Sequence, residues 1–119
     1  MARDLRFPKA RRLTRTVEFD RVRKEGTVKR GRLLWLGVLP LSAGENTRAG
    51  VITSRRLGGA VARNRVRRRL REIYRQHQHD LAGSAWIVTI ATPHAAQASY
   101  QALEHEWLRL AERASILGA

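Results

Sequence analysis

The hydrophobic pattern begins with a short amphipathic helix. Residues 17–25 place Phe19 and Val22 on one face, three positions apart, with charged residues around them. Thr16 precedes this segment as a candidate N-cap, and Gly26 follows it as a natural stop. The spacing therefore predicts one helix early in the chain, packed against a core through its apolar side.

Two apolar segments follow and have the spacing of strands. Residues 33–39 read LLWLGVL, which is too continuously apolar for a half-exposed strand and predicts a largely buried one that ends before Pro40. Residues 48–54 read RAGVITS and predict a second strand. Because only the polar turn at residues 42–47 separates them, we expect the two strands to pair as an antiparallel hairpin.

A long helix is predicted over residues 60–75, which contain neither Gly nor Pro. Apolar residues separated by four, four and three positions form one stripe along it, made of Ala62, Val66, Leu70 and Ile73. The opposite face is polar and almost entirely basic, with Asn64, Arg67, Arg68, Arg71 and Arg75. Gly58 and Gly59, just before the helix, either only form the turn or also let an anion approach its N-terminus.

The last third of the chain predicts one strand and one helix. Residues 85–91, AWIVTIA, are rich in β-branched residues and indicate a buried strand. Ser99 is a candidate N-cap for a helix over residues 100–115, with a core stripe of Leu103, Trp107, Leu110 and Ala114. The order helix, hairpin, helix, strand, helix predicts an α+β two-layer sandwich. We expect residues 14–119 to form a single domain, preceded by a flexible basic arm at residues 1–13.

The net charge of the chain indicates the class of its binding partner. The chain carries 24 Lys and Arg against 10 Asp and Glu, a formal net charge of +14. Residues 55–75 alone hold nine arginines and one acid, Glu72. A solvated helix face normally alternates acids and bases, whereas these arginines repel one another unless an external anion relieves them. Guanidinium groups bind phosphate bidentately, so the sequence predicts a nucleic-acid partner, and the mixed α+β pattern favours RNA.

Residues for protein-borne catalysis are not arranged in any recognisable motif. The chain has no cysteine, which excludes a thiol nucleophile and suits a cytoplasmic protein. His77 and His79 lie in a polar connection with only Asp80 beside them, a weak signal for a metal site. No apolar run is long enough to span a bilayer. We therefore expect a binding protein without a metal site of its own and without a membrane partner.

The aromatic residues have two possible roles at this point. Phe19 and Trp35 either pack in the core, the more common role, or offer stacking surfaces for unpaired bases. Composition alone leaves a ribosomal protein, an RNA chaperone and a subunit of a ribonucleoprotein enzyme equally open, because all three depend on the same electrostatics.

The run at residues 55–72, RRLGGAVARNRVRRRLRE, resembles the signature of the bacterial ribonuclease P protein component, whose centre is the Arg63-Asn64-Arg65 box. The resemblance extends over about residues 12–117. It includes the early helix with Phe19, the strand with Trp35 and the final helix after Pro93. In this chain Arg23 stands where the family often has a second aromatic.

The resemblance implies a subunit that assembles with a catalytic RNA to remove the 5′ leader of precursor tRNA, with Mg²⁺ and the chemistry held by the RNA. It implies a mixed central sheet with a left-handed β-α-β crossover. It also implies a leader-binding cleft containing Phe19 and Trp35. The RNA-binding residues that it implies are Arg55, Arg56, Arg63, Asn64, Arg65, Arg67, Arg68 and Arg71. No protein partner is implied.

Overall fold

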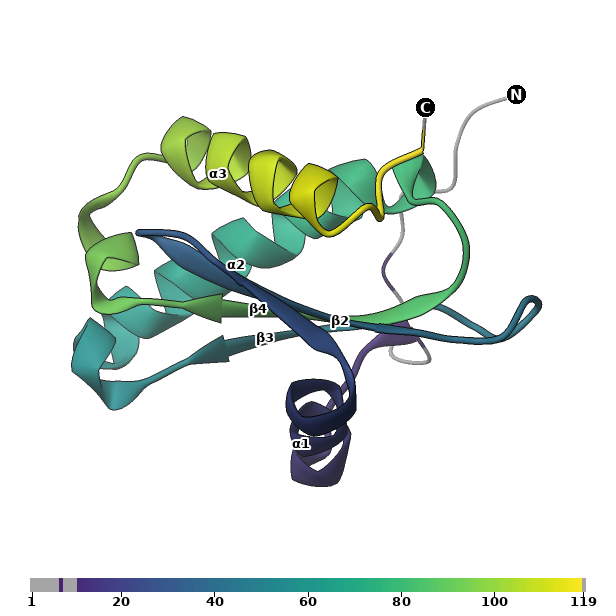
Figure 1. Ribbon diagram of the computed structural model, residues 1–119. Helices are drawn as coiled ribbons and strands as arrows, with labels where there is room; N and C mark the ends of the chain where they lie inside the picture. The colour runs from purple at the N-terminus through teal and green to yellow at the C-terminus, as the bar shows by residue number, and fades with distance from the viewer. Residues whose placement is uncertain (1–6, 8–10, 119) are drawn as a thin grey trace.

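The computed structural model describes residue 7 and residues 11–118, which fold into a four-stranded sheet with helices on both sides (Figure 1). The strands are β1 (Thr27–Arg30), β2 (Leu34–Pro40), β3 (Arg48–Thr53) and β4 (Ala85–Ala91). The α-helices are α1 (Thr16–Glu25), α2 (Ala60–His77) and α3 (Tyr100–Arg113). Three short 3₁₀ turns, η2 (Arg55–Leu57), η3 (Gln78–Asp80) and η4 (Pro93–Gln97), join these elements. The predicted α+β class is confirmed.

The strands lie in the order β1-β2-β4-β3; β2 is antiparallel to both β1 and β4, whereas β3 is parallel to β4. The sheet is therefore mixed. The predicted pairing of β2 with β3 is wrong, because β4 lies between them. The hairpin is instead formed by β1 and β2. The sequence did not predict β1, because its four residues, TVKR, are few and mostly polar. β3, α2 and β4 form a β-α-β unit, and the handedness of its crossover stays a prediction.

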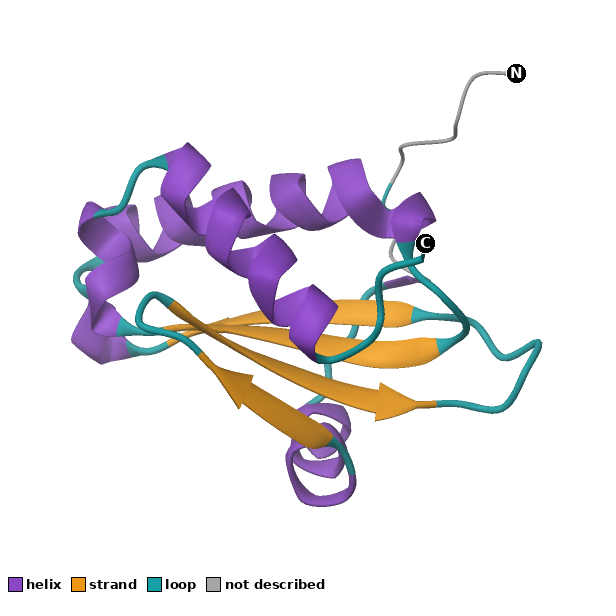
Figure 2. Ribbon diagram, turned by 45° about the horizontal axis from the view of Figure 1, so that its top comes forward, coloured by secondary structure: helices purple, strands orange, loops and turns teal. Residues whose placement is uncertain are grey.

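The main core lies between the sheet and the pair α2 and α3, which cover one face together (Figure 2). The predicted stripes meet there, because Val66, Leu70 and Ile73 of α2 are buried, with Ala62 partly so. On α3, Leu103, Trp107 and Leu110 are fully buried, and Ala114 is partly buried. Ser99 caps α3 as predicted, since its Oγ accepts the N–H of Ala102 at 3.1 Å.

Among the helices of the described residues, α1 alone lies on the other face of the sheet, beneath it in both views. Two glycines let this helix approach. A Cβ at Gly50 would lie 2.5 Å from Cε1 of Phe19, and one at Gly37 would lie 3.1 Å from Cγ1 of Val22. These contacts leave no room for larger side chains, so the glycines set how closely α1 packs.

The start of α1 differs from the prediction. The helix begins at Thr16, so Thr16 is its first residue and Arg15 occupies the N-cap position. The carboxylate of Glu18 compensates by accepting the N–H groups of Thr14 and Arg15 at 3.1 and 3.0 Å. Burial by itself raises the pKa of Glu18, but these N–H groups and the guanidinium of Arg48 outweigh it and lower the pKa.

The chain before α1 contacts the domain at the free edge of β3. Arg12 forms a β-bridge with Ala49, and the N–H of Leu13, which is buried, donates to the carbonyl oxygen of Ala49 at 2.8 Å. The ring of Phe7 lies 4.9 Å from that of Tyr74. The rest of the predicted arm, residues 1–6 and 8–10, lies outside the described residues.

Candidate nucleic-acid interface

The arginine-rich side of α2 faces away from the core, as the sequence predicts. We call it the arginine face and define it by the exposed or half-exposed residues Arg63, Asn64, Arg65, Arg67, Arg68 and Arg71. Arg55 and Arg56 are also exposed, but they lie on the 3₁₀ turn η2 after β3 rather than on the strand itself. The structure therefore brings these eight predicted residues to the first part of α2 and the turn that precedes it.

One hydrogen-bonded chain orders the centre of the arginine face. Arg67 donates to Oδ1 of Asn64 at 3.1 Å and to Oγ1 of Thr53 at 2.8 Å. Because Thr53 ends β3, these bonds tie α2 to the sheet and hold one guanidinium in place. A preorganised guanidinium loses less side-chain entropy when it binds a phosphate than a free one does.

The one acid of the arginine-rich segment does not neutralise this face. Glu72 accepts hydrogen bonds from Arg75 at 2.6 and 2.9 Å and from Gln76 at 3.1 Å, toward the C-terminal end of α2. The bonds from Arg75 and Gln76 lower the pKa of Glu72 to about 2, against the effect of burial. Desolvation, together with repulsion by Arg12 and Arg67, lowers the pKa of Arg71. The cations near Arg71 are therefore in mutual repulsion.

A groove beside α1 is the second candidate surface. We call it the α1 groove. It has a volume of about 290 Å³, and none of the described residues that line it is acidic. Its floor is a row across three strands, since Trp35 of β2 pairs with Ile90 of β4, and Ile90 pairs with Ile52 of β3. The walls come from α1 and β1 and consist of Phe19, Val22, Arg23, Val28 and Arg30.

The structure places both aromatic residues whose role the sequence leaves open at this groove. Trp35 is 37% exposed and lies on the α1 side of the sheet, so it is not a core residue. The guanidinium of Arg30 lies 4.7 Å from the centre of its ring. Phe19 is half-buried, packing on Gly50 while it lines the groove. Both predicted aromatic residues thus lie in one apolar groove with basic edges.

The arginine face and the α1 groove lie on opposite sides of β3. Successive residues of a strand point to opposite faces, so Ile52 lines the groove while Thr53 contacts Arg67 of α2. One strand therefore separates the two candidate surfaces.

The weak signal for a metal site at His77 and His79 gains no support from the described part of the chain. Both ring nitrogens of His77 face carboxylates, with Nε2 at 3.0 Å from Glu104 and Nδ1 at 3.4 Å from Asp80. Its ring stacks on Trp107 at 6.1 Å, which ties α2 to α3. Residues 7 and 11–118 contain no group of three or more His, Cys, Asp or Glu that could hold a metal ion. Among the same residues, no helix is long and apolar enough to cross a membrane.

Sequence reasoning missed several residues of these surfaces. Thr53 and Ile52 belong to a strand that was predicted, and its alternation could have assigned them to opposite faces. Arg30 lies in the short strand β1, whose sequence carries no clear signal. Arg23 was known only as a departure from the resemblance, and the structure places it in the wall of the groove.

An α+β domain with an arginine-coated helix on one side of its sheet and an apolar, basic-edged groove on the other has the features of an RNA-binding protein. Residues 7–115 match the family Ribonuclease P. The Ribonuclease P protein component of Desulfovibrio desulfuricans is 39% identical over 110 residues, which cover 90% of this chain and 85% of that protein. The corresponding protein of Chloroflexus aurantiacus is 40% identical over 112 residues, covering 93% and 82%.

Solved structures share the fold. The RNase P protein of Staphylococcus aureus superposes with a TM-score of 0.83 at 24% identity, over 92% of this chain and all of that one. The RNase P protein of Thermotoga maritima gives a TM-score of 0.75 at 23% identity, over 86% and 96%. This chain belongs to the ribonuclease P protein family. It is the protein subunit of a ribonucleoprotein endoribonuclease, and its role is RNA binding in the 5′ processing of tRNA.

Proposed function

We propose that the arginine face binds the catalytic RNA of ribonuclease P and that the α1 groove binds the 5′ leader of precursor tRNA, in the cytoplasm. The observation that carries this proposal is the pair of basic-edged surfaces on opposite sides of β3. One protein subunit can then hold two RNA segments at the same time, one on each side of the strand. Residues 14–119 act as a single RNA-binding domain.

The two surfaces suit different RNA chemistry. The arginine face offers guanidinium groups and few apolar atoms, so it suits the phosphate backbone of a structured RNA. Arg55 and Arg56 extend this surface past the N-terminus of α2. The α1 groove offers an aromatic ring and an apolar floor for bases, and its Arg23 and Arg30 provide charge for the phosphates between them. Only a single strand can present its bases in this way.

The hydrolytic step belongs to the RNA and its bound Mg²⁺ in this proposal. The chain contributes positive charge that lowers the repulsion between two RNA molecules. It also aligns the leader relative to the scissile phosphate. Such a contribution is most visible when Mg²⁺, which screens the same repulsion, is scarce.

Cleavage of precursor tRNA at limiting Mg²⁺ tests the proposal, with cognate catalytic RNA alone, protein alone and both together. We expect efficient release of the 5′ leader only from the mixture. Cleavage by protein alone would move the chemistry to this chain. A working RNA that the protein does not stimulate would instead favour a structural RNA-binding role, which co-sedimentation with ribosomal subunits in high salt would then examine.

The arginine face has its own test. Replacing Arg67, Arg68 and Arg71 by Ala should weaken binding to the catalytic RNA and flatten its dependence on salt, by roughly one unit of slope for each phosphate that the variant no longer neutralises. Arg113→Ala is the matched control, because this exposed residue lies at the end of α3, away from both surfaces. An unchanged slope in the triple variant would mean that the face is only solvated.

The α1 groove is tested by Trp35→Ala. If a leader base stacks on the ring, the variant should bind precursor tRNA more weakly by roughly 1–3 kcal/mol while its affinity for tRNA without a leader stays the same. Equal reductions for both substrates would argue against a leader site. Urea unfolding of the variant checks that the domain still folds.

A further inference from the structure

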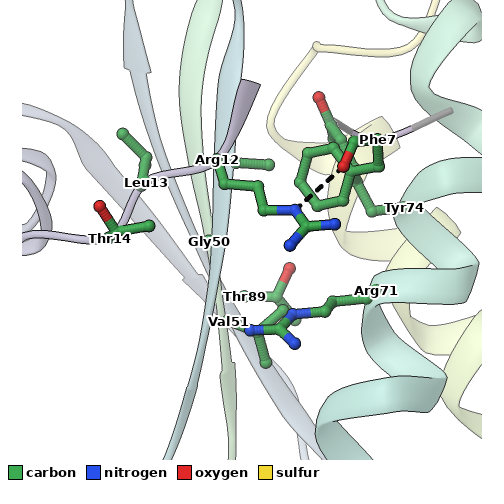
Figure 3. A pocket seen from close by; sticks show the side chains of 10 residues that line it. Phe7, Arg12, Leu13, Thr14, Gly50, Val51, Arg71, Tyr74 and Thr89 are labelled. Carbon is green, nitrogen blue, oxygen red and sulfur yellow. Dashed lines mark hydrogen bonds between the residues drawn. The ribbon is translucent and has the colours of Figure 1, made fainter. Parts of the chain in front are cut away.

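A small cavity of about 50 Å³, open to solvent, lies at the edge of β3, where the segment before α1 meets α2 (Figure 3). Residues from four parts of the chain line it: Phe7, Arg12, Leu13, Thr14, Ala49, Gly50, Val51, Arg71, Tyr74 and Thr89. The cavity is separate from the α1 groove and lies on the side of β3 that faces α2. Nothing in the family resemblance assigns it a role.

Two guanidinium groups reach this cavity from different directions. Figure 3 shows Arg12 entering from the N-terminal segment and Arg71 entering from α2, with their charged ends directed toward the same space. Arg12 is held in place, since its Nε donates to the carbonyl oxygen of Phe7 at 3.0 Å and its guanidinium lies 5.1 Å from the Phe7 ring centre. Its two terminal nitrogens are not used by these contacts.

Arg71 makes no hydrogen bond or ion pair with residue 7 or with residues 11–118. Among residue 7 and residues 11–118, no Asp or Glu lines the cavity. Desolvation lowers the pKa of Arg71, and repulsion by Arg12 and Arg67 lowers it further. An anion placed between them would remove that repulsion.

The cavity also offers a neutral donor. Thr89 is buried, and its Oγ1 accepts the indole N–H of Trp107 at 3.0 Å, so its hydroxyl proton is available to a ligand oxygen. Two forked cations and a hydroxyl around one opening match the several oxygens of a phosphate better than the two oxygens of a carboxylate. The β3 backbone at Gly50 forms part of the wall.

We propose that Arg12 and Arg71 clamp a single phosphate group, extending the RNA-binding surface from α2 to the segment before α1. The inference rests on the proposed function, since the expected source of the phosphate is the backbone of the catalytic RNA. Free inorganic phosphate has the same chemistry and is the other source. Arg12 is then a binding residue outside the arginine-rich signature.

The experiment measures binding of the full-length chain to the cognate catalytic RNA over a series of salt concentrations. It compares the wild type, Arg12→Gln, Arg71→Gln and the double variant. Two arginines that share one phosphate should each lower the salt slope, and the double variant should lower it by about one unit rather than two. The two single effects should be non-additive. A variant with Lys at both positions keeps the charge and should retain most of the slope.

Two controls separate the possible failures. Arg113→Gln should leave the slope unchanged, and Arg67→Gln with Arg68→Gln reports on the arginine face alone. If that second variant lowers the slope while the Arg12 and Arg71 variants do not, the clamp is not used by RNA and the proposed function stands. If the wild type itself does not bind the RNA, the proposed function fails.

Thermal unfolding with and without inorganic phosphate completes the test. Phosphate should raise the Tm of the wild type and of Arg113→Gln, and the increase should be reduced in the Arg12→Gln and Arg71→Gln variants. This reduction combined with an unchanged RNA slope would identify free phosphate as the ligand of the clamp. Unchanged Tm increases together with unchanged slopes would overturn the proposal.

Discussion

The two faces of the sheet are covered to different extents. On one face, α2 and α3 pack over Leu34, Leu36 and Ile87, all of which are essentially inaccessible to solvent. On the other face, α1 covers only part of the sheet, and Trp35 next to it is 37% exposed. The same strands supply both faces, because their side chains alternate from one side to the other.

The face covered by α2 and α3 contributes mainly to stability, whereas we propose that the open face contributes to binding. Burial of apolar area is the main favourable contribution to folding, so the face covered by α2 and α3 holds the domain together. An apolar surface left open in a highly charged protein contributes little to folding and is available to a ligand. The four predictions below compare the two faces, starting with the largest effect.

Trp107→Ala should destabilise the domain most, by roughly 3–5 kcal/mol, because its fully buried ring fills the centre of the main core. Trp35→Ala removes a side chain of the same type from the open face and should lower stability by less than about 1 kcal/mol. Urea unfolding of both variants measures the difference. Equal destabilisation would mean that both faces support the fold equally.

The pKa of Tyr74 tests how far water is excluded from the face covered by α2 and α3. Burial raises the pKa of Tyr74 to about 12 from 10.0, although Arg11 opposes the shift. A raised pKa in the folded state stabilises the fold below pH 10, and this contribution disappears as the pH rises from 10 to 12. The wild type should lose roughly 2 kcal/mol by pH 11.5 that Tyr74→Phe does not lose.

Unfolding by urea at several values between pH 9 and pH 11.5 measures this decline in both proteins. Tyr100→Phe is the comparison, because desolvation also raises the pKa of the less buried Tyr100, and it should reduce the decline less than Tyr74→Phe does. A parallel decline in wild type and Tyr74→Phe would show that the hydroxyl of Tyr74 is solvated in the folded protein.

Gly50→Ala should disturb the face that carries α1. The added methyl group would lie 2.5 Å from Cε1 of Phe19, which must move. Overpacking typically destabilises by roughly 1–3 kcal/mol, and we expect about 1 kcal/mol because the end of an aromatic ring can swing into the groove. The variant should therefore also bind the 5′ leader more weakly than the wild type.

A double-mutant cycle with Phe19→Leu checks the cause of this effect. The smaller side chain should relieve the clash, so that the combined change in unfolding free energy is less than the sum of the two single changes. Strict additivity would place the strain elsewhere.

Gly59→Asn should have the smallest effect, a gain of a few tenths of a kcal/mol. Gly59 has the extended conformation of an N-cap, with φ of −73° and ψ of 179°, and a Cβ there would meet nothing within 4 Å. An Asn side chain can accept an N–H of the first turn of α2, whereas Gly59→Ala adds a methyl group without an acceptor. Thermal unfolding of the two variants should show a higher Tm for Asn than for Ala.

Local patterns explain what was predicted correctly. The stripe of α2, the cap at Ser99 and the buried strand β4 each depend on residues close together in the chain, and all three appear in the structure. The arginine face follows directly from that stripe, since residues opposite an apolar stripe must point outward. The outward position of the residues that we propose to bind RNA on α2 could therefore be predicted from the sequence.

Sequence by itself determined the class of fold, the main helices and strands and the basic surface, because each depends on composition and on a repeat of a few residues. Only the tertiary structure decided that β4 separates β2 from β3, that α1 packs on Gly37 and Gly50, and that Arg12 and Arg71 line the same cavity. These contacts join residues far apart in the chain. The order of the strands and the packing of α1 on the sheet depend on the free energy of the whole core. A local periodicity in the sequence carries no information on that free energy.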